Sequence, residues 1–407
     1  MPTYPFERQR YWIDAPSNNQ PSQAESLPIK PKESAIVHSR TDLLKTYVAP
    51  RNQLEQTIAD ILSKALGIES ISIFDNFFDL GGDSLLAVQV IAKLRDTMQI
   101  DLEAHSLLNN STTIALAELI GETNSKSSNQ PIQTLPSCLV TIQTGNTLIP
   151  PLFLMHPVGG HVYFYRDMVE QLGTEQPVYG LQAQGVDGKT EPLTQVEEMA
   201  THYIKALRIL QPEGPYFLGG SSFGGTLAFE MAQQLQAQAQ KVALLAMMDT
   251  PGLGHMPVEL NDDAEILAYM LELGYDISVP LAELRQLELD EQLDYYIKQI
   301  KITNKELPDL DLANFRTVLK LFKTNSKAMF DYIPKIYPGK ILFFRAKERD
   351  AFLPHNPELA WIDLALEGTE VHIVPGNHIS MNEQPHVQFL AKRLKICLEK
   401  TKADYVK

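Results

Sequence analysis

Cysteine is scarce in this chain of 407 residues, which contains only Cys138 and Cys397. Two cysteines so far apart in sequence form neither the disulfide framework of a small secreted domain nor a metal cluster. A reducing cytoplasm is therefore the expected setting. The chain also lacks any apolar run near the roughly 18 residues that a membrane span needs, and its first residues contain no apolar signal core. We therefore expect no membrane partner.

Basic residues are too few for a nucleic-acid-binding protein. The chain has 35 Lys and Arg against 50 Asp and Glu, which gives a formal net charge of −15. Binding to a phosphate backbone requires a basic surface, so we expect no nucleic-acid partner. Hydrophobic residues make up 44% of the chain and charged residues 21%, which is typical of globular proteins with a sizeable core. The length then predicts two or three domains.

Two segments rich in Pro, Ser, Asn and Gln divide the chain. Residues 16–34 form the first and residues 122–131 the second, and both are typical of linkers. The predicted organisation is a tail and linker over residues 1–47, a small domain over 48–121, a second linker over 122–135 and a large domain over 136–402.

The small domain is predicted to be a helical bundle. Apolar residues recur at helical spacing after Pro50 and again after Ser84, and a third helix is expected after Thr112 or Thr113. The residues with this spacing are Leu54, Ile58, Ile61 and Leu62 in the first helix, Leu86, Val90 and Leu94 in the second, and Leu116 and Leu119 in the third.

Ser84 lies in the segment FDNFFDLGGDSLLAVQVIAKL of residues 74–94. Two glycines precede it and a helical pattern follows, so its hydroxyl is expected at an exposed helix N-terminus, where most serines are only N-caps. The segment resembles the carrier-protein motif of polyketide and nonribosomal peptide synthases, in which the serine of GGDSL receives a 4′-phosphopantetheine arm. The resemblance implies that a phosphopantetheinyl transferase modifies Ser84.

The large domain alternates between short apolar runs and helical or loop segments. This alternation predicts an α/β fold, with a parallel sheet covered by helices on both faces. From about residue 256 to 330 the pattern changes to one helix after another, which predicts a helical insertion where a lid over a site would lie. The apolar runs occupy residues 152–155, 215–218, 242–248, 341–344 and 371–374.

Ser222 is the candidate nucleophile because it occupies the centre of a G-x-S-x-G sequence between a predicted strand and a predicted helix. A serine hydroxyl needs a base to take its proton, and the base needs an orienting acid, in the chain order Ser, acid, His. Asp249 directly follows a fully apolar run and is the favoured acid. Glu348 and Asp350 are the rival acids after a later strand, where the charged loop is expected to be exposed.

His378 is the candidate base, since it lies in the loop PGNHISM after the apolar run of residues 371–374. Of its neighbours, His372 is predicted to be packed or paired within the strand, and His386 to belong to a helix cap region. The oxyanion hole needs two backbone N–H groups. We assign them to Phe223, after the nucleophile, and to Val158, in the loop HPVGG after the first apolar run.

Residues 138–400 resemble the type I thioesterase of polyketide and nonribosomal peptide synthases through HPVGG, GGSSFGG, MMDTP and VPGNHISM. The resemblance implies an α/β-hydrolase with a helical lid. Ser221 departs from it, because Trp or Tyr is common before the nucleophile. The first residues, PTYPFERQRYW, resemble the tail that follows an acyltransferase domain in modular polyketide synthases. They imply that the chain is the end of a longer synthase with ketosynthase and acyltransferase domains upstream.

Together these resemblances predict terminal chain release. An acyl chain held as a thioester on the Ser84 arm is transferred to Ser222 and then released by hydrolysis or as a macrocycle. Two other functions stay open at this point. One is an editing thioesterase that removes stalled acyl groups, and the other is a non-catalytic docking module.

Overall fold

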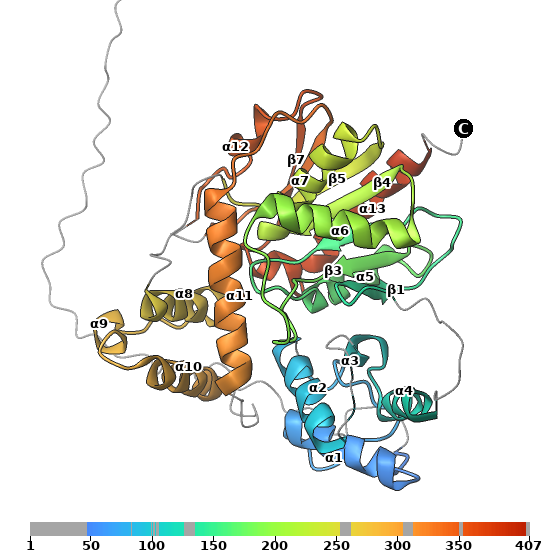
Figure 1. Cartoon of the computed structure of the whole chain (residues 1–407), viewed down its shortest axis with the longest axis vertical. Coiled ribbons are helices and arrows are strands. Elements are labelled where there is room, and N and C mark those ends of the chain that lie inside the picture. The colour runs from blue at the N-terminus through green and yellow to red at the C-terminus, as the bar shows by residue number, and fades with distance from the viewer. Residues whose placement is uncertain are drawn as a thin grey trace, which may run out of the picture. The chain divides into compact units, whose positions relative to one another are not determined.

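The computed structural model describes residues 47–82, 84–98, 100, 102, 106–125, 135–252, 262–303, 312–349 and 353–403 (Figure 1). The predicted N-terminal tail and its linker, most of the second linker, and the rival acid Asp350 lie outside the described residues. The predictions made for them therefore stay predictions.

The small domain is helical, as predicted. Asn52 caps its first helix by accepting a hydrogen bond from the backbone N–H of Glu55 at 2.9 Å, and Gly67 ends that helix with a φ of 68°. The first helix packs against the second and the fourth through side chains such as Ile58 and Leu94, which are fully buried. The helices among the described residues of this domain are α1 (Gln53–Leu66), α2 (Ser84–Met98), α3 (Ser106–Asn109) and α4 (Thr113–Ser125).

The large domain is built on a seven-stranded sheet of order β1-β3-β2-β4-β5-β6-β7. Neighbouring strands are parallel except β1, which pairs antiparallel with β3 at one edge. The strands are β1 (Leu139–Gln143), β2 (Leu152–Met155), β3 (Val178–Leu181), β4 (Tyr216–Ser221), β5 (Val242–Met248), β6 (Ile341–Ala346) and β7 (Thr369–Val374).

Strand β1 adds an antiparallel edge to the parallel sheet that the sequence predicts. It begins with two buried residues and continues with three half-buried ones, and such a weak apolar pattern does not stand out in the sequence. An antiparallel edge strand on an otherwise parallel sheet is common in this class of fold, because one side of the edge can face solvent.

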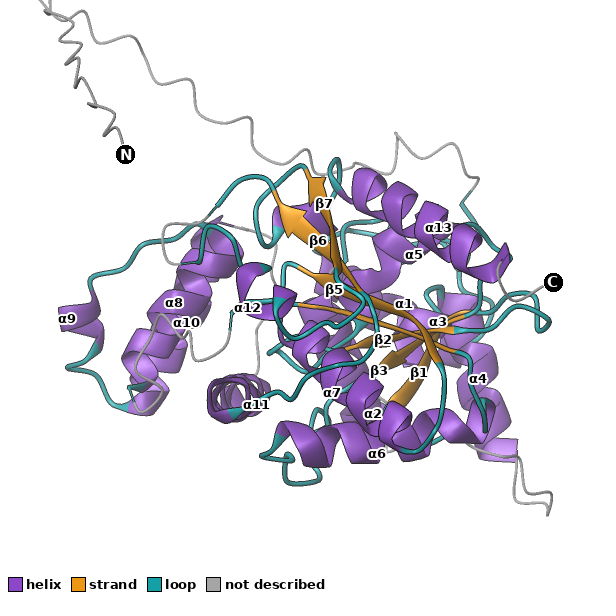
Figure 2. Cartoon of the chain, turned by 90° about the horizontal axis from the view of Figure 1, so that it is seen from above, coloured by secondary structure: helices purple, strands orange, loops and turns teal. Residues whose placement is uncertain are grey.

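Helices cover both faces of the sheet (Figure 2). Phe153 and Met155 of β2 pack on one face with α6 and α7, while Leu152 and Leu154 pack on the other face with α5 and α13. This alternation follows from the period of two residues in a strand, and both sets are buried because the strand is central. The helices are α5 (Arg166–Leu172), α6 (Val196–Leu210), α7 (Phe223–Ala237) and α13 (Val387–Ala403).

A helical segment separates β5 from β6, where the sequence predicts an insertion. Its helices form an apolar cluster of their own, and the last of them also contacts α7. At that contact the Tyr332 hydroxyl donates a 2.7 Å hydrogen bond to the buried Glu230 carboxylate. The segment consists of α8 (Asp263–Tyr275), α9 (Leu281–Leu284), α10 (Leu289–Thr303) and α11 (Leu312–Asp331).

Three short helical turns complete the part of the chain that the structure describes. They are η2 (Tyr163–Tyr165), α12 (Leu359–Ile362) and η3 (Ser380–Asn382). None of the described helices has the length and apolar character required to cross a membrane.

Candidate active site

Ser222 occupies the sharp turn between β4 and α7. The strand ends at Ser221 and the helix begins at Phe223, so the turn has to be made at Ser222 itself, with a φ of 55° and a ψ of −126°. A positive φ is unfavourable for a residue with a side chain, and it persists only where the surroundings enforce it. Ser222 has the strained backbone of a nucleophile elbow.

Glycines at both ends of the motif make this turn possible. A Cβ on Gly220 would lie 2.2 Å from the carbonyl carbon of Gly224, and a Cβ on Gly224 would lie 2.3 Å from the carbonyl oxygen of Met155. Neither position has room for any side chain. The two glycines of the G-x-S-x-G motif are therefore required by the close packing of the α7 N-terminus on β2 and β4.

A tyrosine that was not predicted from the sequence holds the strand ends beside the turn through two hydrogen bonds. The buried Tyr165 hydroxyl accepts a hydrogen bond from the backbone N–H of Ser221 and donates one to the carbonyl oxygen of Met155, each at 2.7 Å. It ties the end of β4 to the end of β2. Its partner Ser221 is 56 residues away in sequence, so no local pattern reveals the contact.

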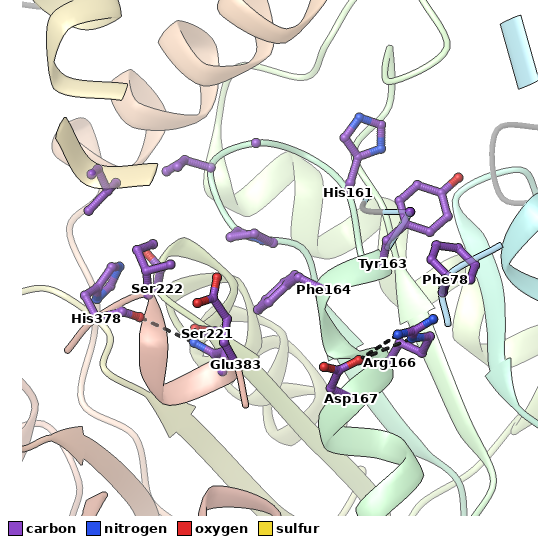
Figure 3. A pocket seen from close by; sticks show the side chains of 17 residues that line it. Phe78, His161, Tyr163, Phe164, Arg166, Asp167, Ser221, Ser222, His378 and Glu383 are labelled. Carbon is purple, nitrogen blue, oxygen red and sulfur yellow. Dashed lines mark hydrogen bonds and ion pairs between the residues drawn. The ribbon is translucent and has the colours of Figure 1, made fainter. Parts of the chain in front are cut away.

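Asp249 and His378 lie together at the ends of β5 and β7. The His378 Nδ1 is 2.8 Å from Oδ2 of Asp249, and both residues are buried. Asp249 has a φ of 45°, a conformation that Asp adopts more readily than most residues. His378 and Ser222 line the same pocket, shown in Figure 3, so the structure brings the three predicted residues to one place.

Arg349 and a backbone amide also bind the Asp249 carboxylate. The Ala346 N–H donates to Oδ1 at 2.9 Å, and the Arg349 Nη1 donates to Oδ1 at 2.6 Å and to Oδ2 at 2.9 Å. Burial raises the pKa of Asp249, but the hydrogen bond and charge of His378, the charge of Arg349 and the Ala346 amide outweigh it and lower that pKa from its ordinary value. The carboxylate is therefore ionised at neutral pH.

The rival residues lie elsewhere. The Glu348 side chain is exposed, whereas Asp249 is 1% exposed. His372 is 3.2 Å from the Glu370 carboxylate and His386 directly precedes α13, and neither lines the pocket that contains Ser222.

The two predicted oxyanion donors belong to α7 and to the loop after β2. Phe223 is the first residue of α7, where backbone N–H groups have no acceptor within the helix. Val158 lines the pocket from the loop after β2. Its carbonyl oxygen accepts a 2.8 Å hydrogen bond from the buried side chain of Asn325 in α11, a contact that spans 167 residues and that the sequence analysis missed.

His156 shapes the loop that carries Val158. Its Nδ1 donates to the carbonyl oxygen of Pro157, and its Nε2 accepts from the Tyr203 hydroxyl, both at 2.7 Å. Burial lowers the pKa of His156 to about 4, so it stays neutral and holds the loop through hydrogen bonds. The base is therefore to be sought in His378 and not in His156.

Mostly apolar side chains of α8 and α11 lie near Ser222. They line a small cavity of about 30 Å³ that also contacts Val158, Ser222 and His378. This wall suits the apolar part of a substrate. The apolar and aromatic residues that α8 and α11 contribute are Tyr269, Leu273, Phe322 and Met329, and the polar Ser326 lies among them.

Ser84 is the first residue of α2, as the carrier motif predicts. A Cβ on Gly82 would lie 2.2 Å from the ring of the fully buried Phe77, and Gly81 has a φ of 98°. The glycines thus let the loop before Ser84 pack tightly against the bundle. A helix N-terminus favours an attached phosphate, so the residues present fit phosphopantetheine. Asp83 lies outside the described residues.

A mixed seven-stranded sheet with a serine at the turn after β4 and an Asp–His pair after β5 and β7 defines an α/β-hydrolase, here a serine hydrolase fold. Residues 150–397 match the family model of the thioesterase domain, and residues 56–120 match that of the phosphopantetheine attachment site. The chain belongs to the thioesterase family and carries a phosphopantetheine carrier domain before the enzyme domain.

Several longer proteins are similar to this chain. A dimodular nonribosomal peptide synthase of Bacillus subtilis (strain 168) is 33% identical over 327 residues, which cover 77% of this chain and 13% of that protein. Malpibaldin synthetase of Mortierella alpina is 32% identical over 362 residues, covering 88% of this chain and 6% of that protein. The chain thus spans a small part of these relatives.

A solved structure of a four-domain nonribosomal peptide synthetase, holo-AB3403 bound to AMP and glycine, is similar with a TM-score of 0.60 and 31% identity. The match covers 87% of this chain and 27% of that one. These relatives support the predicted resemblance to nonribosomal peptide synthases. They do not specifically support the predicted resemblance to polyketide synthases.

We expect Gly224→Ala to destabilise the large domain by about 1–3 kcal/mol or more, because the added Cβ overpacks the contact with Met155. Gly274→Ala in α8 is the control, since its Cβ meets nothing within 4 Å and should stabilise the helix by roughly 0.5–1 kcal/mol. Urea unfolding followed by the fluorescence of the buried Trp361 measures both. Equal stabilities of the two variants would contradict this account of the turn.

Proposed function

We propose that this chain releases finished acyl or peptidyl chains from a nonribosomal peptide synthase or a hybrid with a polyketide synthase. One observation carries the proposal. Ser222, in its strained turn, shares a pocket with His378, which is hydrogen-bonded to Asp249, in a chain that also has a phosphopantetheine carrier domain. The product leaves by hydrolysis or by attack of an internal nucleophile that closes a macrocycle.

Each of the three residues has a distinct role in this proposal. With its Nδ1 proton donated to Asp249, His378 keeps the lone pair of Nε2 available to accept the Ser222 hydroxyl proton. Ser222 then attacks the thioester carbonyl and becomes acylated. Asp249 fixes the imidazole tautomer and stabilises the imidazolium that forms. His378 next returns the proton to the leaving thiol. In the release step, water or an internal nucleophile attacks the acyl-enzyme carbonyl, and His378 takes its proton and passes it to the departing Ser222 oxygen.

The backbone amides of Phe223 and Val158 are proposed to bind the oxyanion that forms during attack. Removing one donor of this kind costs roughly 10²–10³-fold in rate. The hydrogen bond from Asn325 to the Val158 carbonyl supports this role, because it fixes the loop that presents the second amide.

The carrier domain supplies the substrate. Phosphopantetheine attached at Ser84 provides a long arm whose thiol holds the acyl group as a thioester. Two domains in one chain raise the effective concentration of that thioester near Ser222. The proposed partners are a phosphopantetheinyl transferase and upstream synthase domains; a ketosynthase and an acyltransferase among them rest on the resemblance of the first residues.

The loading site is tested with coenzyme A and a phosphopantetheinyl transferase. We expect the chain to gain one arm and Ser84→Ala to gain none, because the attached phosphate requires that hydroxyl. Ser106→Ala is the matched control, since Ser106 also begins a helix of the same domain and should leave loading unchanged. Intact-protein mass measures the gain, and an arm that persists in Ser84→Ala would remove the carrier assignment.

The nucleophile and base are tested together. Ser222→Ala and His378→Ala should each lower thioester cleavage by roughly 10⁴-fold or more, and the double variant should be little worse, because members of a triad act as a unit. Ser221→Ala is the matched control and should keep most of the activity. The rate of thiol release from acyl-pantetheine substrates of increasing length provides the measurement.

Two outcomes of that measurement would change the assignment. A strong preference for acetyl over long acyl groups would identify an editing thioesterase. If the wild-type chain cleaves no acyl thioester, its function would instead be that of a non-catalytic docking module.

A further inference from the structure

Arg349 is a mostly buried arginine beside the candidate acid. It lies three residues after the end of β6, and its side chain is 9% exposed while that of Asp249 is fully buried. One nitrogen, Nη1, contacts both carboxylate oxygens, and Oδ2 is shared with His378. Two groups that can carry positive charge therefore meet at one buried carboxylate.

Two further hydrogen bonds hold Arg349, one from its side chain and one from the backbone of the residue before it. Its Nε donates a 3.0 Å hydrogen bond to the carbonyl oxygen of Pro354. The N–H of the preceding residue, Glu348, donates to the carbonyl oxygen of Gly376 in the loop that leads to His378. The guanidinium is thus fixed relative to both the acid and the loop of the base.

We propose that Arg349 is a positioning residue for thioester cleavage, which keeps Asp249 ionised and directs its Oδ2 to His378. The inference rests on the proposed function of Ser222, His378 and Asp249. Its physical basis is that a carboxylate without exposure to water favours its neutral form unless a cation compensates the charge. A neutral acid would no longer fix the His378 tautomer.

The charge of Arg349 has a definite effect on the pH dependence. A proton on Asp249 removes the charge that orients His378 for activation of Ser222, and the nearby positive charge of Arg349 disfavours that proton. Removing Arg349 lets Asp249 bind a proton more tightly. The acidic limb of the acylation rate must then move to higher pH by about one pH unit or more, because an adjacent arginine lowers the pKa of an aspartate by about 1–3 units.

Other charged groups near His378 are unchanged by substitution of Arg349. His161, Arg166, Asp167 and Glu383 line the same pocket, and Arg166 is paired with Asp167 at 3.1 Å. Burial, with the nearby Asp167, raises the pKa of Glu383. Because these groups are common to all variants, differences between the variants report on Arg349.

Arg345, in β6 itself, offers a matched control. Its Nη1 is 2.6 Å from the carboxylate of Glu358, whose side chain is 8% exposed, so it also forms a partly buried ion pair. This pair does not involve Asp249. Arg345→Gln therefore reproduces the loss of a similar ion pair without touching the proposed acid.

The test is the pH dependence of single-turnover acylation of Ser222 by an acyl-N-acetylcysteamine thioester, measured in the full chain. We expect Arg349→Gln to shift the acidic limb up by about one pH unit and to lower the plateau roughly 10–100-fold. Arg349→Lys retains the charge and should keep the wild-type limb, with a lower plateau because one ammonium cannot reproduce the guanidinium contacts. Arg345→Gln should keep the wild-type limb.

A double substitution guards against a variant that fails to fold. Asp249→Asn combined with Arg349→Gln removes both charges, and its acylation rate should equal that of Asp249→Asn alone if Arg349 acts through Asp249. A further loss in the double variant, or a wild-type limb in Arg349→Gln, overturns the inference. Absence of Ser222 acylation in the wild-type chain would overturn the proposed function and this inference with it.

Discussion

The carboxylate of Asp249 is buried and charged, and the arrangement of the site depends on how that charge is compensated. An unpaired carboxylate in such a place would be strongly destabilising. Here its oxygens bind the Ala346 amide at the end of β6, Arg349 in the loop after β6 and His378 in the loop after β7. The parallel register of β5, β6 and β7 brings these residues to one edge of the sheet. One buried charge thus links the acid, the base and their supports.

The nucleophile depends on a second constraint, which is steric. The α7 N-terminus packs so closely on β2 and β4 that only glycine fits at Gly220 and Gly224, and Ser222 is forced into a positive φ. The backbone strain is offset by the packing around it, including the Tyr165 bridge between the two strands. The same geometry leaves the Phe223 amide in the first turn of a helix, where it has no partner within the helix.

The elements that the sequence predicts well are those with local signals. The apolar runs, the glycines around Ser222 and the loop positions of Asp249 and His378 follow from short patterns, and the structure brings these three residues together. Strand β1 was not predicted because its apolar pattern is weak. Arg349 was not predicted because the charged loop in which it lies indicates solvent exposure. Its side chain is mostly buried while that of its neighbour Glu348 is exposed, and this difference depends on the pairing of β6 with β5 and β7. Asn325 contacts Val158 from a helix far along the chain, which no local pattern encodes.

The central claim is that Ser222 accepts the acyl group from the carrier arm before release. The most direct measurement loads Ser84 with an isotopically labelled acyl-pantetheine arm, quenches the reaction at short intervals and maps the label by mass spectrometry of peptides. We expect the label to leave the peptide that contains Ser84 and to reach the peptide that contains Ser222 before free product accumulates. Product that forms while no label ever occupies Ser222, or label on a different residue, would contradict the account.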